Sequence, residues 1–252
     1  MFTERKRTED ALLRSEKLAT LGRLAATIAH EINNPLEAVT NTLYLARVSA
    51  EDPASQLQYL DMADDELKRI AHITRQTLGF YRESSAPAAV SVGIVLDAAE
   101  DLLRAKIKAK RASIEKQYDL DRQVAAVPGE LRQVFSNLLA NSLDAIEEQG
   151  AIKLRISKST SVTNDRSRIR VTIADNGKGI DAATLPRIFE PLFTTKEATG
   201  SGLGLWVSKQ IIEKHGGSIR VRSSPRKPRS GTVISIFLPA MEEPATEGAA
   251  AD

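Results

Sequence analysis

The chain contains no cysteine. Disulfide bridges and thiolate metal sites are therefore both excluded, which is consistent with a reducing compartment. It also has no apolar run near the ~18 residues that a membrane-spanning helix requires, and its charged beginning is not followed by an apolar segment. We expect a cytoplasmic chain that makes no membrane contact of its own, while a longer parent protein could be anchored through other segments.

A strong excess of one charge is also missing. Lys and Arg number 35 against 33 Asp and Glu, which gives a formal net charge of +2. That excess is too small to indicate a nucleic-acid partner, and the basic residues look scattered rather than gathered on one face. The densest basic stretch, Arg220–Arg229, is interrupted by Ser and Pro, so we interpret it as a solvated loop.

The first part of the chain has a helical pattern. From Thr3 to about Ala50 the only glycine is Gly22, and apolar residues recur at spacings of three, four and seven, which predicts a helix with a heptad-like seam. The predicted seam consists of Leu18, Leu21, Ala25, Ile28, Ile32, Val39, Leu43 and Ala46. Residues 1–17 are mostly charged and polar, and we interpret them as the end of a coiled coil entering from an absent sensor.

A break and a second helix follow. Pro53 disfavours helix in the residue before it, so Glu51–Ser55 predicts a turn, and an amphipathic helix is predicted from about Gln56 to Arg82. Two long helices joined by a short turn form a helical hairpin. One hairpin leaves much of its apolar face wet, whereas two copies bury it in a four-helix bundle. We therefore predict an all-α hairpin over residues 18–84 that forms a homodimer.

The second part of the chain alternates between helical and strand periodicities. Residues 85–89 have linker composition, and residues 90–240 predict an α+β two-layer sandwich with helices over one face of a mixed sheet. The predicted helices are Ser91–Lys108, Gly129–Glu148 and Gly202–Lys214, and the predicted strands are Ser113–Tyr118, Gln123–Ala126, Ile152–Ser157, Arg168–Ala174, Ser218–Arg222 and Thr232–Leu238. Residues 241–252 carry four acids and no base, which predicts a disordered acidic tail.

One histidine stands out on the first predicted helix. His30 lies two residues from its seam neighbours, about 200° of helix rotation, so it points away from the seam. A single helical histidine is more often a surface or core imidazole, but here Glu31 follows directly and Asn34 lies one turn further on the same face. Pro35 removes a backbone hydrogen bond beside the histidine and should bend the helix there.

Two asparagines mark the predicted helix at 129–148. Asn137 and Asn141 are four residues apart, so they share one stripe of an otherwise apolar helix. Asparagine is a poor helix former because its side chain competes for backbone groups. Such a pair is either two buried amides bonded to each other and to backbone, or a neutral oxygen ligand for Mg²⁺ beside a triphosphate. Asp144 follows three residues after Asn141.

Two glycine-rich segments follow predicted structure elements. Asp175–Ile180 comes directly after a strand, and its glycines, Gly177 and Gly179, permit either a hairpin turn or close approach of a flat ligand. Gly200–Leu205 precedes a helix, where free N–H groups and the helix dipole favour phosphate. The stretch Phe189–Lys196 between them predicts a mobile lid over a nucleotide.

These motifs, in this order and at these spacings, resemble the transmitter core of bacterial two-component sensor histidine kinases. The stretch His30–Leu36 is similar to the phosphoacceptor box of that family, His-Glu-x-x-Asn-Pro-Leu, and the resemblance extends from Ser15 to Leu238. It implies a dimerisation and phosphoacceptor hairpin followed by an ATP-binding domain of the gyrase, chaperone and histidine-kinase superfamily.

The resemblance also implies the chemistry. His30 would take the γ-phosphoryl group of Mg-ATP while Glu31 takes the imidazole proton, and an Asp of a cognate response regulator would then receive the group. Asn34 sharing a face with His30 suggests, as a hypothesis, that it orients water when the regulator is dephosphorylated.

In the ATP-binding domain the resemblance gives Asn141 as the Mg²⁺ ligand, with Asn137 in support, and Asp175 as acceptor of the adenine amine. The implied nucleotide-binding residues are Asn137, Asn141, Asp175, Gly177, Gly179, Lys196, Gly200, Gly202, Leu203 and Gly204.

Other functions share parts of this pattern. A phosphatase-dominant protein would carry every motif, and a scaffold without catalysis or a serine kinase of the same fold would share the ATP-binding domain. ATPases of the superfamily that activate water use a Glu one turn before the metal-binding Asn. Here that position is Asn137, so hydrolysis is disfavoured as the main reaction.

Overall fold

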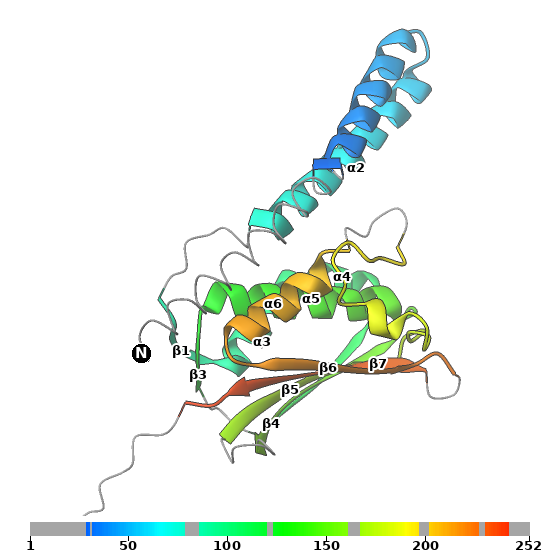
Figure 1. Ribbon diagram of the computed structural model, residues 1–252. Coiled ribbons are helices and arrows are strands. Elements are labelled where there is room, and N and C mark those ends of the chain that lie inside the picture. The colour runs from blue at the N-terminus through cyan, green and yellow to red at the C-terminus, as the bar shows by residue number, and fades with distance from the viewer. Residues whose placement is uncertain are drawn as a thin grey trace, which may run out of the picture. The chain divides into compact units, whose positions relative to one another are not determined.

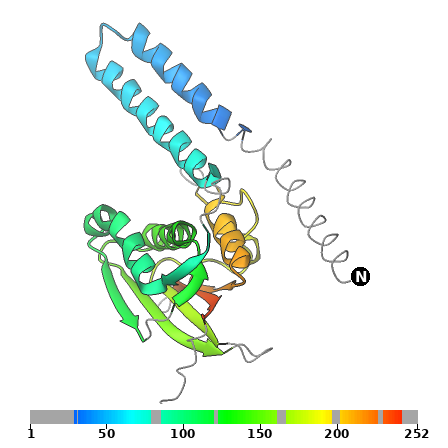
Figure 2. The ribbon, with the colours of Figure 1, turned by 90° about the vertical axis from the view of Figure 1, so that its left-hand side faces the viewer.

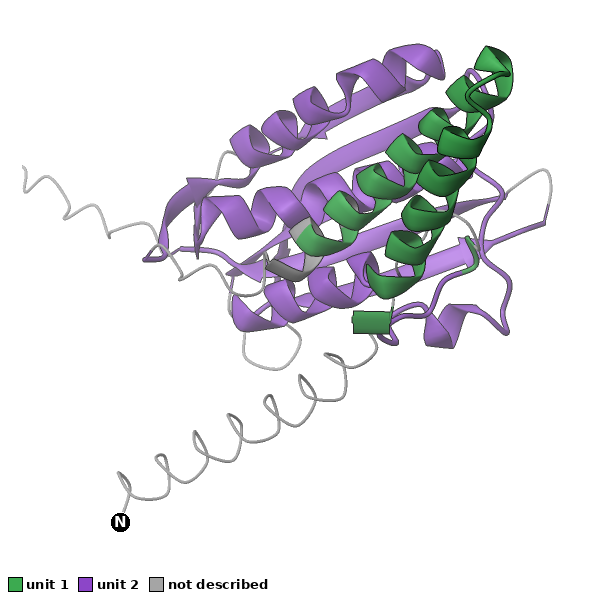
Figure 3. Cartoon of the chain, turned by 90° about the horizontal axis from the view of Figure 1, so that it is seen from above, with its two compact units in different colours: residues 1–78, 195–201 green, residues 79–194, 202–252 purple. Residues whose placement is uncertain are grey.

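A computed structural model describes residues 29–30, 32–78, 86–119, 123–160, 167–196, 202–226 and 230–241. The chain divides into two compact units, residues 1–78 with 195–201 and residues 79–194 with 202–252 (Figure 3). The coiled-coil entry predicted at 1–17, the proton acceptor Glu31, the loop glycine Gly200 and the tail beyond Met241 lie outside the described residues.

The first unit contains a helical hairpin (Figure 2). Its first helix includes residues 32–48, and α2 spans Pro53–Leu78. Asp52 caps α2, because its carboxylate accepts hydrogen bonds from the Ala54 N–H at 3.2 Å and the Ser55 hydroxyl at 2.6 Å. The predicted start at Gln56 is therefore three residues late. Proline fits the first position of a helix, where its missing N–H has no partner to lose.

The hairpin buries part of the predicted seam; Leu18, Leu21, Ala25 and Ile28, also predicted in it, lie outside the described residues. On the first helix the buried residues are Pro35, Val39, Thr42 and Ala46. Thr42 satisfies its hydroxyl within the helix, by donating to the Ala38 carbonyl at 2.9 Å. Leu43, predicted in the seam, is instead exposed. The bend predicted at Pro35 depends on the carbonyl of Glu31, outside the described residues, and it stays a prediction.

Four leucines form a second, exposed apolar stripe on the hairpin. They lie in two pairs seven residues apart, with exposed fractions of 43% to 50%: Leu36 and Leu43 on the first helix, Leu60 and Leu67 on α2. A seven-residue spacing keeps side chains on one side of a helix. The hairpin therefore has one stripe for its own packing and another that the described part of the chain leaves exposed.

The second unit is a two-layer α+β sandwich (Figure 1). Its helices are α3 (Val92–Leu102), α4 (Arg104–Ala109), α5 (Pro128–Ala145) and α6 (Gly204–Lys214), with a short 3₁₀ helix η1 (Leu185–Arg187). The predicted helix at 91–108 is thus two helices, interrupted at Leu103. There the chain leaves the helical conformation, with φ −103° and ψ 6°.

Five strands form the main sheet in the order β2-β4-β5-β7-β6. They span Ser113–Tyr118 (β2), Ala151–Thr160 (β4), Ser167–Asp175 (β5), Ser218–Ser224 (β6) and Gly231–Pro239 (β7). The β2–β4 pair is parallel and the other pairs are antiparallel, which confirms the predicted mixed sheet. A separate antiparallel pair joins β1 (Ala88–Ser91) to β3 (Gln123–Ala126). Ala88 and Ala89 therefore belong to β1, not to the predicted linker.

The core lies between the sheet and its helices. Figure 1 shows α3, α5 and α6 over one face of the sheet. Alternate residues of the strands point into this layer and are buried, as the period of two requires. Among them are Ile152, Leu154, Ile156, Ile169, Val171 and Ile173, against Leu131, Val134, Phe135, Leu138, Leu139 and Leu143 of α5. The predicted helical and strand periodicities are confirmed in this core.

The opposite face of the sheet corrects the interpretation of the basic residues. Arg220–Arg229 does not form a loop throughout, since β6 includes Arg220 and Arg222. The alternation on β5, where Ile169 and Val171 are buried, points Arg168 and Arg170 to the face away from the helices. Basic residues distant in sequence therefore gather on one face, contrary to the scattered distribution inferred from sequence.

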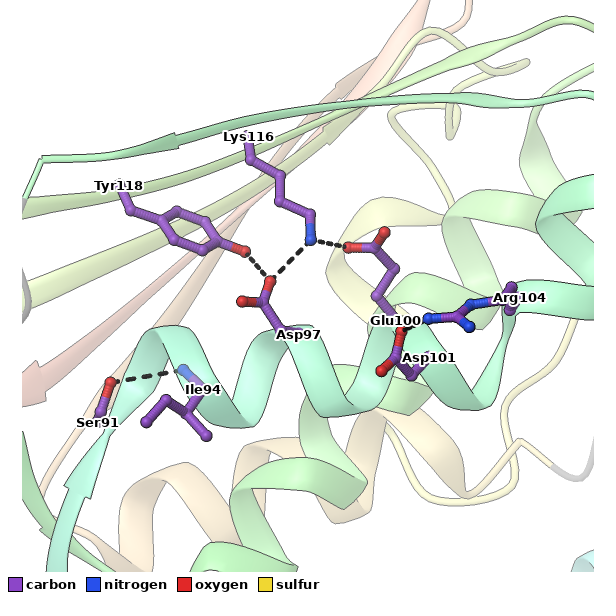
Figure 4. Close-up of polar contacts among 8 residues, drawn as sticks. All are labelled: Ser91, Ile94, Asp97, Glu100, Asp101, Arg104, Lys116 and Tyr118. Carbon is purple, nitrogen blue, oxygen red and sulfur yellow. Dashed lines mark hydrogen bonds and ion pairs between the residues drawn. The ribbon is translucent and has the colours of Figure 1, made fainter.

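A charged cluster fastens the edge strand β2 to α3 (Figure 4). The Lys116 ammonium lies 2.8 Å from Asp97 and 2.7 Å from Glu100, and the Tyr118 hydroxyl donates to Asp97 at 3.0 Å. Desolvation acts to lower the pKa of Lys116, but the bonds to Asp97 and Glu100 outweigh it and raise that pKa. Lys116 therefore stays charged and holds the outermost strand against the helix layer.

Among the described residues, no helix combines the length and the apolar character that crossing a lipid bilayer would take.

Candidate nucleotide-binding site

The centre of the candidate site is the carboxylate of Asp175, the last residue of β5. One carboxylate oxygen accepts hydrogen bonds from the backbone N–H groups of Gly177, at 3.0 Å, and Thr232, at 3.2 Å. The other accepts one from the hydroxyl of Ser142 on α5, also at 3.0 Å. Three separate elements therefore fix the direction of one acidic side chain.

Burial decides the protonation behaviour of this carboxyl. Desolvation raises the pKa of Asp175 above its ordinary value of 3.8, because it disfavours the charged form. The hydrogen bonds from Gly177, Ser142 and Thr232 act in the opposite direction and keep the shift smaller. An acid in such surroundings is typical of a functional site.

The turn after Asp175 needs its glycines for contact with neighbouring backbone. A Cβ at position 177 would lie 2.5 Å from the Ala145 carbonyl oxygen, at the end of α5. Gly179 has φ +72°, and a Cβ there would lie 2.1 Å from the Ser224 carbonyl oxygen on β6. The segment predicted as a close-approach turn is therefore pressed between α5 and β6, beside the carboxylate.

Helix α5 contributes both predicted asparagines to the second unit. Asn137 donates to the Gly204 carbonyl at 3.4 Å, which joins α5 to the beginning of α6. Ser208 donates to the same carbonyl at 2.8 Å. Asn141 is half-buried and directly precedes Ser142, the partner of Asp175. The asparagine helix, the aspartate turn and the glycine-rich helix start thus form one continuous region.

The start of α6 has the features of a phosphate-binding terminus. No side chain caps it, and the first N–H groups of a helix have no partner within the helix. Leu203 immediately before it is buried and anchors the terminus in the core. Gly204, the first residue of α6, leaves the approach without a side chain.

The predicted lid has a fixed base. The Leu192 N–H donates to the Gly202 carbonyl at 3.1 Å, and both residues have a left-handed φ, of 66° and 64°. A Cβ at position 202 would lie 2.2 Å from the Leu192 carbonyl carbon. Lys196 groups with the first unit, so its predicted nucleotide contact stays a prediction, as does that of Gly200.

Asp144 has a partner that its position in the sequence did not indicate. Its carboxylate forms an ion pair with Lys106 of α4. This neighbour compensates the acidic charge near Asn141.

In the first unit, His30 and Asn34 are both helical and exposed. Four residues separate them, so they share one face of the helix. This confirms that the imidazole points away from the buried stripe. The predicted contact of His30 with Glu31 lies outside the described residues.

Sequence reasoning missed Ser142 and Thr232, which orient Asp175. It also missed Ser223, whose hydroxyl accepts a 2.8 Å hydrogen bond from the Ile180 N–H and so supports the turn. Thr232 acts through its backbone and leaves no signal in the sequence. Ser142 does leave one, because a hydroxyl at a core position of an apolar helix needs a partner.

Comparison with known proteins agrees with this arrangement. Residues 126–242 match the model of the histidine kinase-, DNA gyrase B- and HSP90-like ATPase family. Residues 20–86 match the His Kinase A phospho-acceptor domain. The fold and the site therefore define an ATPase-type nucleotide-binding domain preceded by a phosphoacceptor hairpin.

Relatives match both domains at once. The chain is 34% identical over 242 residues to the signal transduction histidine-protein kinase AtoS of Escherichia coli, and 35% identical over 241 residues to sporulation kinase A of Bacillus subtilis. Each match includes 94% of this chain but 38% of the relative. The structure of histidine kinase ThkA in complex with response regulator protein TrrA aligns with a TM-score of 0.71 at 27% identity, over 90% of this chain and 64% of that one. The chain belongs to the two-component sensor histidine kinases and corresponds to their transmitter core.

Proposed function

We propose that this chain binds ATP, phosphorylates its own His30 and passes the phosphoryl group to an aspartate of a response regulator. The observation that carries the proposal is the combination of an exposed helical histidine with a domain whose buried Asp175 is held by three hydrogen bonds. The chain spans about two fifths of the two relatives named above, so its signal lies outside this proposal.

The nucleotide would bind along the region from Asp175 to α6. The Asp175 carboxylate accepts the adenine amine, and the close turn through Gly177 and Gly179 lets a flat base approach the backbone. The triphosphate then points to the N-terminus of α6, where Gly202 to Gly204 present N–H groups without side chains. Lys196 and Gly200 are proposed to add contacts from the lid when it closes.

Asn141 is the proposed Mg²⁺ ligand. The described residues contain no group of three or more His, Asp or Glu side chains that could hold a metal by themselves. A single amide oxygen fits the usual way of holding Mg²⁺, in which phosphates and water complete the coordination. Bound there, Mg²⁺ would neutralise phosphate charge, and Asn137 would support the site by tying α5 to α6.

The transfer step is an in-line displacement at the γ-phosphorus. One imidazole nitrogen of His30 forms the new P–N bond while the P–O bond to the β-phosphate breaks, leaving ADP. Glu31 takes the proton from the other imidazole nitrogen, a contribution of about 10²–10⁴-fold to the rate. Positioning and charge neutralisation supply the rest. Movement about the chain before β1 would bring the two sites together.

The proposed partners follow from the hairpin. The exposed stripe of Leu36, Leu43, Leu60 and Leu67 is suited to a second copy, which would complete a four-helix bundle. A receiver domain would dock on the same hairpin beside His30. The relative ThkA was solved in complex with response regulator TrrA, which supports a partner of this kind.

A regulator phosphatase activity is a second candidate, favoured by the shared exposure of His30 and Asn34. The Asn34 amide would orient the water that attacks the aspartyl phosphate. Asn34→Ala should slow dephosphorylation of a cognate regulator while leaving phosphorylation of His30 intact. An unchanged dephosphorylation rate would exclude this role.

Labelling with γ-³²P-ATP and Mg²⁺ tests the main proposal. The label should be lost in acid, kept in base and absent from His30→Gln. His72→Gln is the matched control, because it removes a histidine from the other helix of the same hairpin and should keep the label. ATP binding without any label on the unaltered chain would contradict the proposal.

A further inference from the structure

The outward face of β5, β7 and β6 carries a cluster of four arginines, the arginine face: Arg168, Arg170, Arg220 and Arg222. The strands are neighbours in the sheet. Arg168 and Arg170 are opposite Pro239 and Phe237 of β7, and Arg220 and Arg222 are opposite Ser235 and Val233. The four guanidinium groups therefore extend from one patch of sheet.

An aromatic ring organises the middle of this patch. The guanidinium carbon of Arg170 lies 5.8 Å from the centre of the Phe237 ring, and that of Arg220 lies 5.4 Å from it. Arg170 also donates to the Ser235 hydroxyl at 3.3 Å. Stacking on a ring fixes a guanidinium while most of its N–H groups stay available to a carboxylate.

The charges of the arginine face are not matched within the described part of the chain. None of the ion pairs among the described residues involves these four arginines. On the neighbouring strand β4, by contrast, Lys153 pairs with Glu115 at 2.7 Å and Arg155 pairs with Asp119 at 3.2 Å. The arginine face thus presents an excess of positive charge where the adjacent part of the same face is neutralised.

The chain supplies a complementary segment next to this face. Residues 242–252 contain four carboxylates, Glu242, Glu243, Glu247 and Asp252, and no basic residue. The chain is fixed up to Met241, whose N–H donates to the Gln123 carbonyl at 2.9 Å. The first two acids therefore follow within four residues of Pro239, the strand partner of Arg168.

The length of the segment is sufficient. The reach is counted from Met241, the last fixed residue. An extended chain advances about 3.3 Å per residue, so Glu247 can lie up to about 20 Å from Met241 and Asp252 up to about 36 Å. The most distant arginine, Arg222, is opposite Val233, eight residues back from Met241 and hence about 26 Å away, which is within the reach of Asp252. A tether of this kind gives an effective concentration in the millimolar range, which favours this segment over a separate acidic partner.

We propose that residues 242–252 fold back onto the arginine face of their own chain, where their carboxylates pair with the guanidinium groups. The arginine face is then an internal docking surface for the acidic segment. This inference does not depend on the proposed kinase reaction.

A spin label tests the contact in the full chain. Gly248→Cys introduces a single thiol for a nitroxide, since the chain has no other cysteine. In a spectrum of ¹⁵N-labelled protein at low salt, the amide signals of Thr172 and Ser235 on the outward face should lose intensity. They should recover near 1 M salt, where the Debye length is about 3 Å, and in the double variant Arg220→Gln/Arg222→Gln.

The matched control is Arg132→Gln, which removes an exposed arginine from α5 on the helix side and should leave the loss of intensity unchanged. Full signal intensity at low salt, or loss that persists in the double variant, would overturn the proposal. A second sample mixes ¹⁵N-labelled chains that carry no nitroxide with separate spin-labelled chains. Loss of amide signal intensity in that mixture would assign the contact to a neighbouring molecule. Binding of the unaltered chain to phosphatidylserine vesicles at the same salt, abolished in the double variant, would assign the arginine face to lipid.

Discussion

The hydroxyl of Ser142 donates a 3.0 Å hydrogen bond to the carboxylate of Asp175. The serine lies on α5 directly after Asn141, and the aspartate ends β5. This bond makes the direction of the proposed adenine acceptor depend on the helix that carries the proposed Mg²⁺ ligand. The positions of the adenine and of the Mg²⁺-bound phosphates would thus both depend on α5.

Removing that hydroxyl should weaken ATP binding. A hydrogen bond to a charged group contributes about 1.5–3 kcal/mol, and about 1.4 kcal/mol corresponds to a tenfold change in affinity. We expect Ser142→Ala to raise the Kd for ATP about tenfold, measured by calorimetry. Ser136→Ala on the same helix is the control, since its buried hydroxyl has no hydrogen-bond partner among the described residues. Equal affinities for the two variants would contradict this role.

Asp175→Asn should change how stability depends on pH. In the folded state the pKa of Asp175 is raised above its ordinary value of 3.8, which applies to the unfolded state. At pH values between the unfolded-state pKa and the folded-state pKa, the folded state therefore binds more protons than the unfolded state. Stability conferred by the native residue therefore falls as pH rises through that interval. The asparagine does not titrate. The free energy of unfolding of the variant, relative to that of the unaltered protein, should therefore increase as pH rises through this interval and level off above it.

Urea unfolding of both proteins from about pH 4 to pH 7 measures this difference. Trp206, the one tryptophan of the chain, lies on α6 and reports on the second unit. The variant should lose ATP binding at every pH. A stability difference that shrinks as pH rises would show that burial does not govern this carboxyl.

The exposed leucine stripe should control dimerisation. Leu60→Glu places a charge where a second copy would bury a leucine, which costs several kcal/mol, and should give monomers in light scattering at micromolar concentration. Met62→Glu is the control, because two residues along a helix is about 200° of rotation and Met62 is similarly exposed. If Met62→Glu dissociates the protein and Leu60→Glu does not, the dimer uses another face.

Gly202→Ala should impair nucleotide binding. The added Cβ would meet the Leu192 backbone at 2.2 Å, in addition to the cost of a left-handed φ of 64°, which is about 1–2 kcal/mol. Gly216→Ala is the control and carries only the cost of the left-handed φ. The φ of Gly216 is 68°, and the nearest atom to an added Cβ is a Pro239 side-chain atom at 3.5 Å. Equilibrium titration with ATP should show weaker binding for Gly202→Ala only. Unchanged affinity in both would mean that the base of the lid is not part of the site.

The sequence predicted secondary structure correctly where the hydrophobic periodicity of a segment matches the way that the segment packs in the core. The strands at 113–118 and 123–126 were predicted at their observed bounds, and the helix predicted at Gly129–Glu148 is α5, observed at Pro128–Ala145. The predicted helix at 91–108 failed at Leu103, since a local change of conformation leaves an amphipathic pattern almost intact.

Contacts across the sheet could not be predicted from neighbours in the sequence. Arg168 and Arg222 are 54 residues apart and come together only through the registers of β5, β7 and β6. The backbone N–H of Thr232 reaches Asp175 by the same pairing. Motifs made of contiguous residues could therefore be recognised in the sequence. The side chains and backbone groups that support those motifs could be identified only once the fold was known.

The hydrogen bond between Leu192 and Gly202 separates the intervening stretch from the rest of the domain. Because its two ends are already held together, a change in the number of residues between them does not alter the position of α6. Doubling the length of a flexible loop costs only about 0.6 kcal/mol. This stretch is therefore a place where insertions can accumulate and diverge without disturbing the fold, so related chains can differ here in length while keeping the same turn after Asp175.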